Sequence, residues 1–258
     1  MNDLLNIDPS AEKKKITLFI KNVLKKQGFK NVVIGLSGGI DSAVSLALVG
    51  KATPAQNIFV AHLYYFKSQI NFLLPFLEKT NIPQKNIHNI SIKNAVDQLR
   101  KTMKLTKASS NYHLRLGNIM ARVRMIALYD LAKKHKALVC GTENKSEFYL
   151  GYFTRFGDEA SDFEPIRHLY KTQVYQLANY LNIPKKIIDL SPTAGLWASQ
   201  TDETDYDFSY EEADRVLDLY LDGEKSFSEI IFQEFPNAKR IMDWVRKNSF
   251  KHHLPYTP

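Results

Sequence analysis

A short glycine-rich segment, residues 35–42, constrains the fold of this chain more than any other stretch. It reads Gly-Leu-Ser-Gly-Gly-Ile-Asp-Ser and lies between two apolar runs. The run before it, 31–36, is β-branched and apolar, which is typical of a buried strand. The run after it, 43–50, is rich in good helix formers and ends at Gly50. In such a strand–loop–helix unit, glycines let backbone amides approach an anion and the helix N-terminus favours negative charge, so the segment predicts a phosphate-binding loop.

Asp41 distinguishes this loop from a Walker A loop. A Walker A loop ends in Gly-Lys-Ser/Thr, whereas this segment has no lysine and carries an aspartate instead. A carboxylate beside phosphates repels them unless a divalent cation lies between, so Asp41 is predicted to be a Mg²⁺ ligand. The pattern Ser-Gly-Gly-x-Asp-Ser resembles the pyrophosphate loop of the ATP pyrophosphatases, which split ATP into AMP and pyrophosphate. The alternative is a glycine turn with a capping Asp or Ser, and six specified positions in this context disfavour it.

Length and composition narrow the class of protein. The chain has 258 residues, of which 44% are hydrophobic and 24% charged, and its net charge is +8. These are ordinary globular values, and the positive charge suits polyanionic ligands, either nucleotides or nucleic acid. There is no apolar run of about 18 residues and no signal-peptide pattern, so no membrane association is predicted. The single cysteine, Cys140, excludes an internal disulfide and a cysteine-based zinc site, and a cytoplasmic location is expected.

Strands alternate with helices along the first 140 residues. We expect strands at 31–36, 57–64, 86–90 and 137–140. Helices are expected at 10–28, 43–50, 69–78 (interrupted near Pro75), 92–103 and 114–136, and the chain from about residue 165 onward is expected to be mostly helical. This alternation predicts an α/β fold with a doubly wound parallel sheet, helices on both faces, a mainly helical C-terminal part, and ligands at the C-terminal strand ends. Without repeats or a long linker, a single domain over 1–258 is expected.

The segment 141–147, Gly-Thr-Glu-Asn-Lys-Ser-Glu, is a second candidate binding element. Thr142 follows a predicted strand and can reach adenosine or phosphate, and Glu147 can supply a second carboxylate to a metal at Asp41. Alternatively, Thr142 and Asn144 only cap the following helix. The presence of the phosphate-binding loop in the same chain favours the binding role.

Two further segments have the composition of binding loops. In 151–158, a glycine-bounded aromatic pair stands beside Arg155 and Asp158, which predicts either a lid over a flat ring or an aromatic turn in the core. The segment 192–197 and the nearby Gln-Thr-Asp-Glu at 200–203 offer hydroxyls to a phosphate, although by themselves they are unremarkable.

In combination and in this order, the segments resemble the ammonia-dependent NAD synthetases, a family of the ATP pyrophosphatase superfamily. The resemblance covers about residues 31–64 and 117–221. The matching segments are SGGIDS at 37–42, GNIMARVRM at 117–125, GTENKSE at 141–147, GYFTRFGD at 151–158, PTAGLW at 192–197 and QTDE at 200–203. Several ordered matches are far more specific than any one of them.

The resemblance implies an adenine nucleotide alpha-hydrolase-like sheet and a homodimer with the helix at 114–136 in the interface, completing a shared active site. The same helix carries Asn118, Arg122 and Arg124, which packing against the sheet alone is not expected to use. It also implies the reaction: ATP-dependent amidation of deamido-NAD to NAD through an acyl-adenylate, with release of AMP and pyrophosphate. Because the nucleophiles are the substrate carboxylate and ammonia, no protein nucleophile is required. The chemistry instead requires positioning and charge stabilisation by amides, lysine and Mg²⁺.

The resemblance assigns roles to residues as follows. ATP is held by Gly35, Leu36, Ser37, Gly38, Gly39, Ile40, Asp41, Ser42, Thr142, Lys171 and Thr193. Mg²⁺ is held by Asp41 and Glu147. Deamido-NAD is held by Asn118, Arg122, Tyr152, Thr154, Arg155, Asp158, Asp162 and Lys251. Asp158 is also the candidate catalytic residue, which accepts a proton from ammonium.

The chain departs from the family pattern at several of these positions. Arg155 replaces the usual lysine, which keeps the charge but not the geometry. Glu159 and Ala160 replace two glycines, and His62 stands in a segment that usually carries Arg-x-Pro, so adenine contacts there cannot be assigned. At the C-terminus only Lys251 is carried over.

Three alternatives remain. An RNA-thiolating ATP pyrophosphatase usually carries further cysteines and an RNA-binding domain, so no nucleic-acid partner is expected. A glutamine-dependent synthetase would need an amidase domain before the first strand, where only 30 residues stand. A non-catalytic nucleotide sensor is disfavoured by the presence of Asp41, Glu147 and Lys171.

Overall fold

The computed structural model describes residues 5–193, 195, 202–231 and 235–252. Four parallel strands form one sheet in the order β3-β2-β1-β4. The strands are β1 (Asn31–Gly35), β2 (Ile58–Tyr64), β3 (Ile87–Ser91) and β4 (Ala137–Cys140). The chain winds outward from β1 to β2 and β3 and then returns to place β4 on the other side of β1. The point where the strand order reverses therefore lies between β1 and β4.

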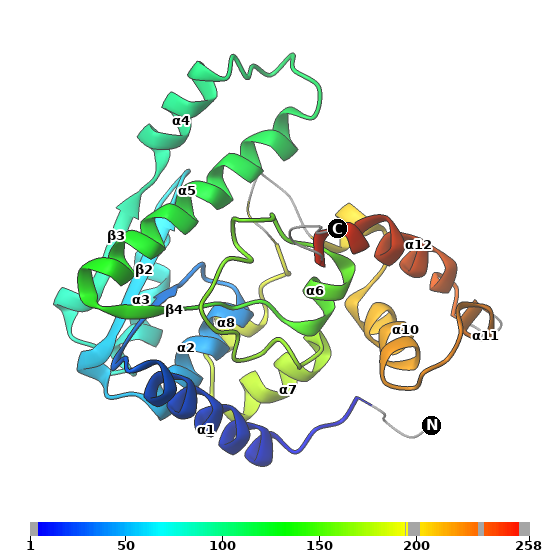
Figure 1. Ribbon diagram of the computed structural model, residues 1–258, viewed down its shortest axis with the longest axis horizontal. Helices are drawn as coiled ribbons and strands as arrows, with labels where there is room; N and C mark the ends of the chain where they lie inside the picture. Colours follow the sequence, from blue (N-terminus) through cyan, green and yellow to red (C-terminus); the bar gives the residue numbers. More distant parts are fainter. Residues whose placement is uncertain (1–4, 194, 196–201, 232–234, 253–258) are drawn as a thin grey trace.

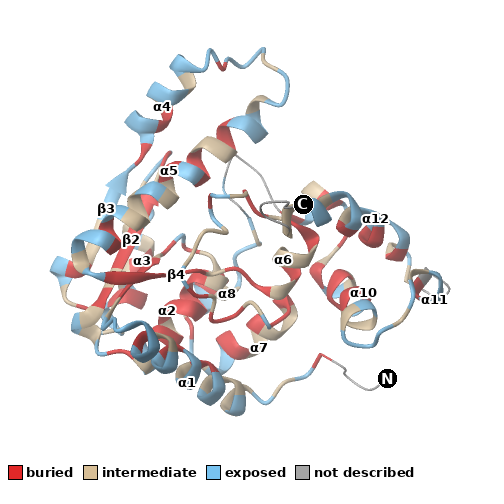
Figure 2. Cartoon of the chain, in the orientation of Figure 1, coloured by how far each residue is buried: buried red, intermediate tan, exposed pale blue. Residues whose placement is uncertain are grey.

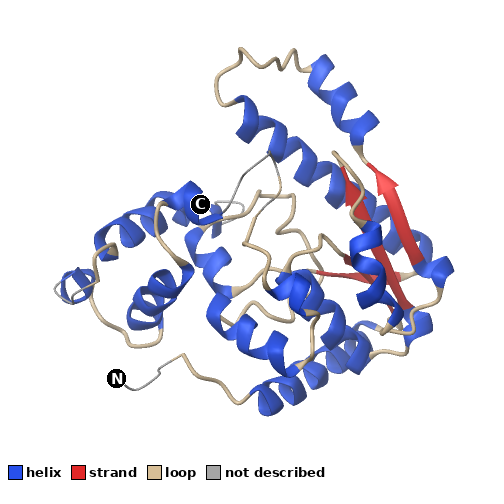
Figure 3. Ribbon diagram, turned by 180° about the vertical axis from the view of Figure 1, so that it is seen from behind, coloured by secondary structure: helices blue, strands red, loops and turns tan. Residues whose placement is uncertain are grey.

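Helices cover both faces of the sheet, as Figures 1 and 3 show. The α-helices of the first part are α1 (Pro9–Gln27), α2 (Ile40–Ala52), α3 (Ile70–Glu78), α4 (Lys93–Thr102), α5 (Tyr112–His135) and α6 (Lys145–Leu150). Those that follow are α7 (Lys171–Tyr180), α8 (Lys185–Ile188), α9 (Asp202–Tyr206), α10 (Tyr210–Leu221), α11 (Phe227–Ile231) and α12 (Ala238–Asn248). Short 3₁₀ helices occupy Ala55–Asn57, Gln84–Asn86 and Ser249–His252. No helix within the described ranges is long and apolar enough to cross a membrane.

The alternation of side chains along β1 explains the two layers. Val32 and Ile34 pack into one apolar cluster with α1, α2, α3 and α7, whereas Val33 packs into another with α4 and α5. All three side chains are fully buried, because a central parallel strand is covered on both faces. Figure 2 shows the neighbouring strand β4 buried along its length. The predicted α/β fold is confirmed.

The C-terminal helices form a third apolar cluster beside the sheet. It is built from α10 and α12 and includes Leu150 of α6 and Tyr170, the residue before α7. The cluster therefore joins α10 and α12 to helix α6 and to the start of helix α7. That residues 1–258 form a single domain stays a prediction.

Most elements begin and end within two residues of the expected positions, but two helices, α2 and α3, differ from the expectation in other ways. Helix α2 begins at Ile40 with Gly39 as its N-cap, so Asp41 lies in the first helical turn and not in the loop. Helix α3 runs through Pro75. The proline removes one backbone hydrogen bond, but the burial of Leu73 and Phe76 on either side of it in the core keeps the helix continuous.

Candidate functional site

The site lies at the C-terminal ends of β1 and β4. Ile34 pairs with Cys140 in the parallel register, so the loops that leave the two strands, 35–39 and 141–144, start side by side. These are the loops that the sequence marked as binding elements. Their position at the reversal of strand order is the position where doubly wound sheets bind ligands.

The loop 35–39 is held in shape by its own serines. Gly38 has a φ of +106°, which a residue with a side chain rarely adopts. The Ser37 hydroxyl accepts the Gly39 N–H at 3.2 Å and lies 3.1 Å from the Ser42 hydroxyl, which donates to the Gly39 carbonyl at 2.9 Å. No side chain caps the start of α2. The first amides of that helix are thus available to an anion.

His62 holds this loop from the side. Its Nδ1 lies 2.9 Å from the Leu36 carbonyl oxygen, and its Nε2 accepts the Gln69 backbone N–H at 3.1 Å. Because a carbonyl only accepts and a backbone amide only donates, the proton resides on Nδ1. The sequence identified His62 only as a departure from the family pattern, and its neighbours in space were not predictable from it.

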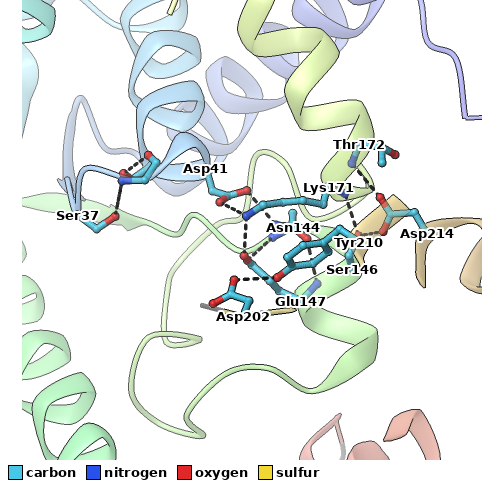
Figure 4. Close-up of polar contacts among 12 residues, drawn as sticks. Ser37, Asp41, Asn144, Ser146, Glu147, Lys171, Thr172, Asp202, Tyr210 and Asp214 are labelled. Atoms are coloured by element: carbon cyan, nitrogen blue, oxygen red, sulfur yellow. Dashed lines mark hydrogen bonds and ion pairs between the residues drawn. The ribbon is translucent and has the colours of Figure 1, made fainter. Parts of the chain in front are cut away.

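Lys171 connects Asp41 of α2 with Glu147 of α6. Its ammonium nitrogen lies 2.5 Å from Asp41 Oδ2 and 3.1 Å from Glu147 Oε1, and its side chain is 2% exposed (Figure 4). Burial by itself would lower the pKa of Lys171, but the two carboxylates outweigh burial and raise it. Burial raises the pKa of Glu147, and Lys171 opposes that shift. The lysine is therefore a buried cation shared by two acidic groups.

Asn144 fixes both carboxylates relative to each other. Its side-chain amide donates to Asp41 Oδ1 at 2.9 Å, and its Oδ1 accepts the Glu147 N–H at 2.9 Å. Asn144 and Glu147 also form a capping box at the start of α6. Asn144 therefore caps α6, and this cap is compatible with the predicted binding role of the segment.

The donor set around Asp41 suits Mg²⁺ in the presence of a nucleotide. Magnesium is usually held by one or two carboxylates, substrate phosphates and waters. Asp41 and Glu147 supply two carboxylates beside the loop 35–39, with side chains 15% and 17% exposed. No cluster of three or more His, Cys, Asp or Glu suited to a metal occurs in the described part of the chain. The residues present fit a magnesium ion that is completed by phosphate oxygens.

Asp202 is a third acidic residue near Lys171, and the sequence interpretation missed it. It is 3% exposed, and its Oδ2 accepts the Tyr210 hydroxyl at 3.0 Å. Burial raises its pKa, and Lys171 opposes that shift. The Lys171 nitrogen lies 5.1 Å from the centre of the Tyr210 ring. Asp202 belongs to the segment 200–203, for which the sequence analysis considered only hydroxyl groups. The burial of Asp202 marks it as a residue of the site, and burial could not be predicted from composition.

Glu143 and Glu164 form a second acidic pair that sequence reasoning did not identify. The Glu143 N–H donates to Glu164 Oε2 at 3.1 Å, and the Ser161 hydroxyl donates to Glu164 Oε1 at 2.8 Å. Burial raises the pKa of Glu164 to about 7. A Cβ at Gly141 would lie 1.8 Å from Glu164 Oε1, so only glycine fits at the end of β4 while Glu164 keeps this position.

Predicted dinucleotide-binding residues meet between α5 and the segment 151–158. The Thr154 hydroxyl donates to Asn118 Oδ1 at 2.9 Å. Arg122 donates to the Arg155 carbonyl through Nε at 3.3 Å and Nη2 at 3.2 Å. Asp158, whose carboxylate accepts the Thr154 N–H at 3.0 Å, completes the group. Five of the eight residues assigned to this role therefore lie together.

The other predicted binding residues have separate positions. The Tyr152 hydroxyl donates to Asp205 Oδ2 at 2.6 Å, and the exposed Asp162 accepts the Val139 N–H at 2.7 Å. Lys251 donates to the Gly151 and Phe153 carbonyls at 2.5 and 3.0 Å, so its ammonium group is bound to the backbone of the segment 151–158.

Thr142 and Thr193 occupy two different loops. Thr142 is partly buried at the end of β4. Thr193 is exposed, and its hydroxyl accepts the Gly195 N–H at 3.0 Å. Residues 194 and 196–201 of the motifs at 192–197 and 200–203 lie outside the described residues.

Desolvation by neighbouring protein atoms raises the pKa of Asp158. Thr154 and Arg124 oppose that shift. The Asp158 side chain is exposed at the surface of the site.

The surface of α5 that is exposed to solvent is narrower than the apolar pattern of the sequence suggests. Val123 is buried against the sheet, and Arg124 donates to the Leu63 carbonyl at 3.1 Å, so both belong to the packing of α5 on the sheet. The expectation that sheet packing leaves Arg124 unused is wrong. Ile126 is 60% exposed and Arg122 is exposed, so these side chains are open to a partner.

Comparisons with known proteins agree with this geometry. The sequence profile of the family described as NAD synthase matches residues 12–255. The NH(3)-dependent NAD(+) synthetase of Chlorobium phaeovibrioides is 38% identical over 93% of this chain and 86% of its own length. The solved NH3-dependent NAD synthetase of Campylobacter jejuni, in complex with nitrate, is 30% identical with a TM-score of 0.80, over 98% of this chain and 100% of that one. The solved NMN synthetase of Francisella tularensis is 34% identical with a TM-score of 0.82, over 98% of this chain and 99% of that one.

Proposed function

The chain belongs to the NAD synthase family, and on that premise we propose that it converts deamido-NAD to NAD with ATP and ammonia. Membership disfavours the RNA-thiolating alternative. The observation that carries the proposal is the convergence of Asp41, Glu147 and Lys171 beside the loop 35–39 at the reversal of strand order.

The first half of the reaction is adenylation. The nicotinic-acid carboxylate attacks the α-phosphorus of ATP, the bond to the β-phosphate oxygen breaks, and pyrophosphate leaves. The amides of the loop 35–39 and the ammonium group of Lys171 stabilise the negative charge on the phosphates. A Mg²⁺ ion held by Asp41 and Glu147 would neutralise further charge on the phosphate oxygens.

The second half is amide formation. Ammonia attacks the acyl carbon, one nitrogen-bound proton is lost, and AMP leaves with the electrons of the broken C–O bond. Asp158 is exposed in the site and anchored by the Thr154 N–H, which supports a role in accepting a proton from ammonium. Asn118, Arg122, Thr154 and Arg155 would then position the dinucleotide next to it.

The exposed strip of α5 supports a homodimer with a shared site. Ile126 offers apolar surface, and Arg122 on the same helix can meet anionic groups of a substrate bound across the interface. The free, buried Cys140 and the small anionic substrates are consistent with an enzyme of the cytoplasm.

A second substrate deserves testing because a structural neighbour is described as an NMN synthetase. The same amidation on the deamidated mononucleotide would give NMN. Both substrates present the same nicotinic-acid carboxylate, and only the dinucleotide carries an adenylate moiety that Asn118, Arg122, Thr154 and Arg155 would help to position.

The decisive assay offers the purified chain ATP, Mg²⁺ and ammonium with deamido-NAD or with the deamidated mononucleotide. We expect one NAD and one pyrophosphate per ATP consumed, and a higher kcat/KM for the dinucleotide. Ammonium should support turnover and glutamine should not. A higher kcat/KM for the mononucleotide would replace the substrate assignment, and the absence of product from both would contradict the proposed function.

A further inference from the structure

Helix α10 contacts both helices that carry the charged residues of the site, α6 with Glu147 and α7 with Lys171. Two of its buried side chains, Tyr210 and Asp214, are four residues apart and therefore lie on the same face of the helix. Tyr210 reaches the side-chain end of Lys171, as described above.

Asp214 reaches the backbone end of the same lysine. It is fully buried, its Oδ1 accepts the Ser146 hydroxyl, and its Oδ2 accepts the Thr172 N–H at 2.8 Å (Figure 4). The Ser146 oxygen in turn accepts the Lys171 N–H at 2.8 Å. One carboxylate thus satisfies the first two amides of α7, one directly and one through a hydroxyl.

These partners are adjacent in sequence to the charged residues. Ser146 precedes Glu147 in α6, and Thr172 follows Lys171 in α7. The first amides of a helix have no partner within the helix, and a negative charge at this end stabilises it. A shift of Asp214 would therefore move the start of α7 and the first turn of α6 together.

We propose that Asp214 is a positioning residue, which sets Lys171 and Glu147 at the distance that the adenylation step requires. The inference rests on the proposed function, because adenylation is the step in which these two residues act. Helix α10 then has a role beyond packing in the core, since its Asp214 holds Lys171 and Glu147, the charged centre of the site, in their relative positions. A misplacement of about 1 Å in such a centre can cost about 100-fold in rate.

The test measures pyrophosphate exchange into ATP in the presence of deamido-NAD, with protein concentration corrected for the folded fraction. In Asp214→Asn, which keeps the size but loses one acceptor and the charge, we expect kcat for exchange to fall about 10- to 100-fold. The KM for deamido-NAD should change less than about threefold, because no dinucleotide-binding residue touches Asp214. Ser146→Ala should lower kcat in the same manner. Glu211→Gln, an exposed position on the same helix, is the matched control and should leave both constants unchanged.

A purely structural role would lower the melting temperature and the folded fraction while kcat per folded molecule stayed constant, and that result overturns the proposal. If Asp214→Asn does not fold, Ser146→Ala decides, and wild-type kcat in that variant overturns the proposal as well. Failure of the wild-type protein itself to exchange pyrophosphate would instead count against the proposed function.

Discussion

The ammonium nitrogen of Lys171 and the carboxylate of Asp41 lie 2.5 Å apart, although 130 residues separate them in the sequence. The pair connects the first turn of α2 to the first turn of α7. Lys171 thereby offsets part of the negative charge of the site. Removing one member of a buried ion pair leaves an uncompensated charge, which typically costs about 3–5 kcal/mol.

Replacing Lys171 with methionine should therefore affect stability and activity together. We expect Lys171→Met to lose at least about 100-fold in turnover, because a charged group aimed at the phosphates is removed. Its melting temperature should fall in the absence of metal and recover in part with Mg²⁺, which would bind the two unpaired carboxylates. Lys185→Met, at the exposed start of α8, is the control. A variant with normal stability and no response to Mg²⁺ would contradict the buried-cation role.

Asp41→Asn and Glu147→Gln should each lower turnover by about two orders of magnitude or more while the fold is retained. The reason is the loss of a carboxylate from the predicted Mg²⁺ site. Turnover measured against Mg²⁺ concentration should show a raised requirement for the metal. Asp189→Asn, at an exposed position after α8, should behave as wild type. Near-normal activity of either site variant at ordinary Mg²⁺ would refute the metal assignment.

The fold could be predicted well from the sequence because the local composition of 31–36 and 43–50 indicates a strand and a helix. The run 31–36 is apolar and β-branched, and the order of strands and helices fixes a parallel sheet. The start of α2 could not be predicted from the sequence, since Ile40 and Asp41 follow glycines that are equally compatible with a loop. The path of α3 through Pro75 depends on burial of side chains by distant elements, which no local pattern records.

The candidate site was predicted only in part, and for a related reason. Residues in glycine-rich motifs, such as Asp41 and Glu147, stand out by their neighbours in sequence. Asp214 stands in an ordinary amphipathic helix, and His62 in an ordinary strand, so their roles arise only when the chain brings Ser146 or Leu36 beside them. Arg124 was misassigned because a surface-like residue on a helix can still donate to a strand carbonyl.

Glu164 predicts a pH dependence of stability. Its pKa is raised to about 7 in the folded protein, from about 4.5 in an unfolded chain, mainly by burial. The folded state then holds the proton more tightly, so the free energy of unfolding should fall as pH rises from about 4.5 to 7 and level off above that. The group's contribution is on the order of 1–3 kcal/mol. Thermal unfolding from pH 5 to 8 should show the melting temperature of Glu164→Gln rising relative to wild type, and a constant difference would contradict the shift.

The dimer prediction centres on Ile126. We expect Ile126→Asp to yield monomers in sedimentation experiments, with loss of deamido-NAD binding, because it places a charge in a predicted apolar interface. Arg122→Ala should weaken deamido-NAD binding while the dimer survives. Val123→Asp is unsuitable for this purpose, since Val123 is buried within the subunit and its loss would unfold the chain. A fully active Ile126→Asp monomer would refute the shared site.

The long separation between Asp41 and Lys171 also has a consequence for how the protein matures. Closing a loop of this length carries an entropic cost that helices and the β1–β2 and β2–β3 pairs, which are closer in sequence, do not carry, so we expect this contact to form late. The Ser146–Asp214 contact spans 68 residues and depends on α10. A chain emerging from the ribosome can therefore complete most of its sheet while the charged centre is still unassembled. In refolding experiments we expect helical circular dichroism to recover before catalytic turnover, with the delay set by docking of the C-terminal helices.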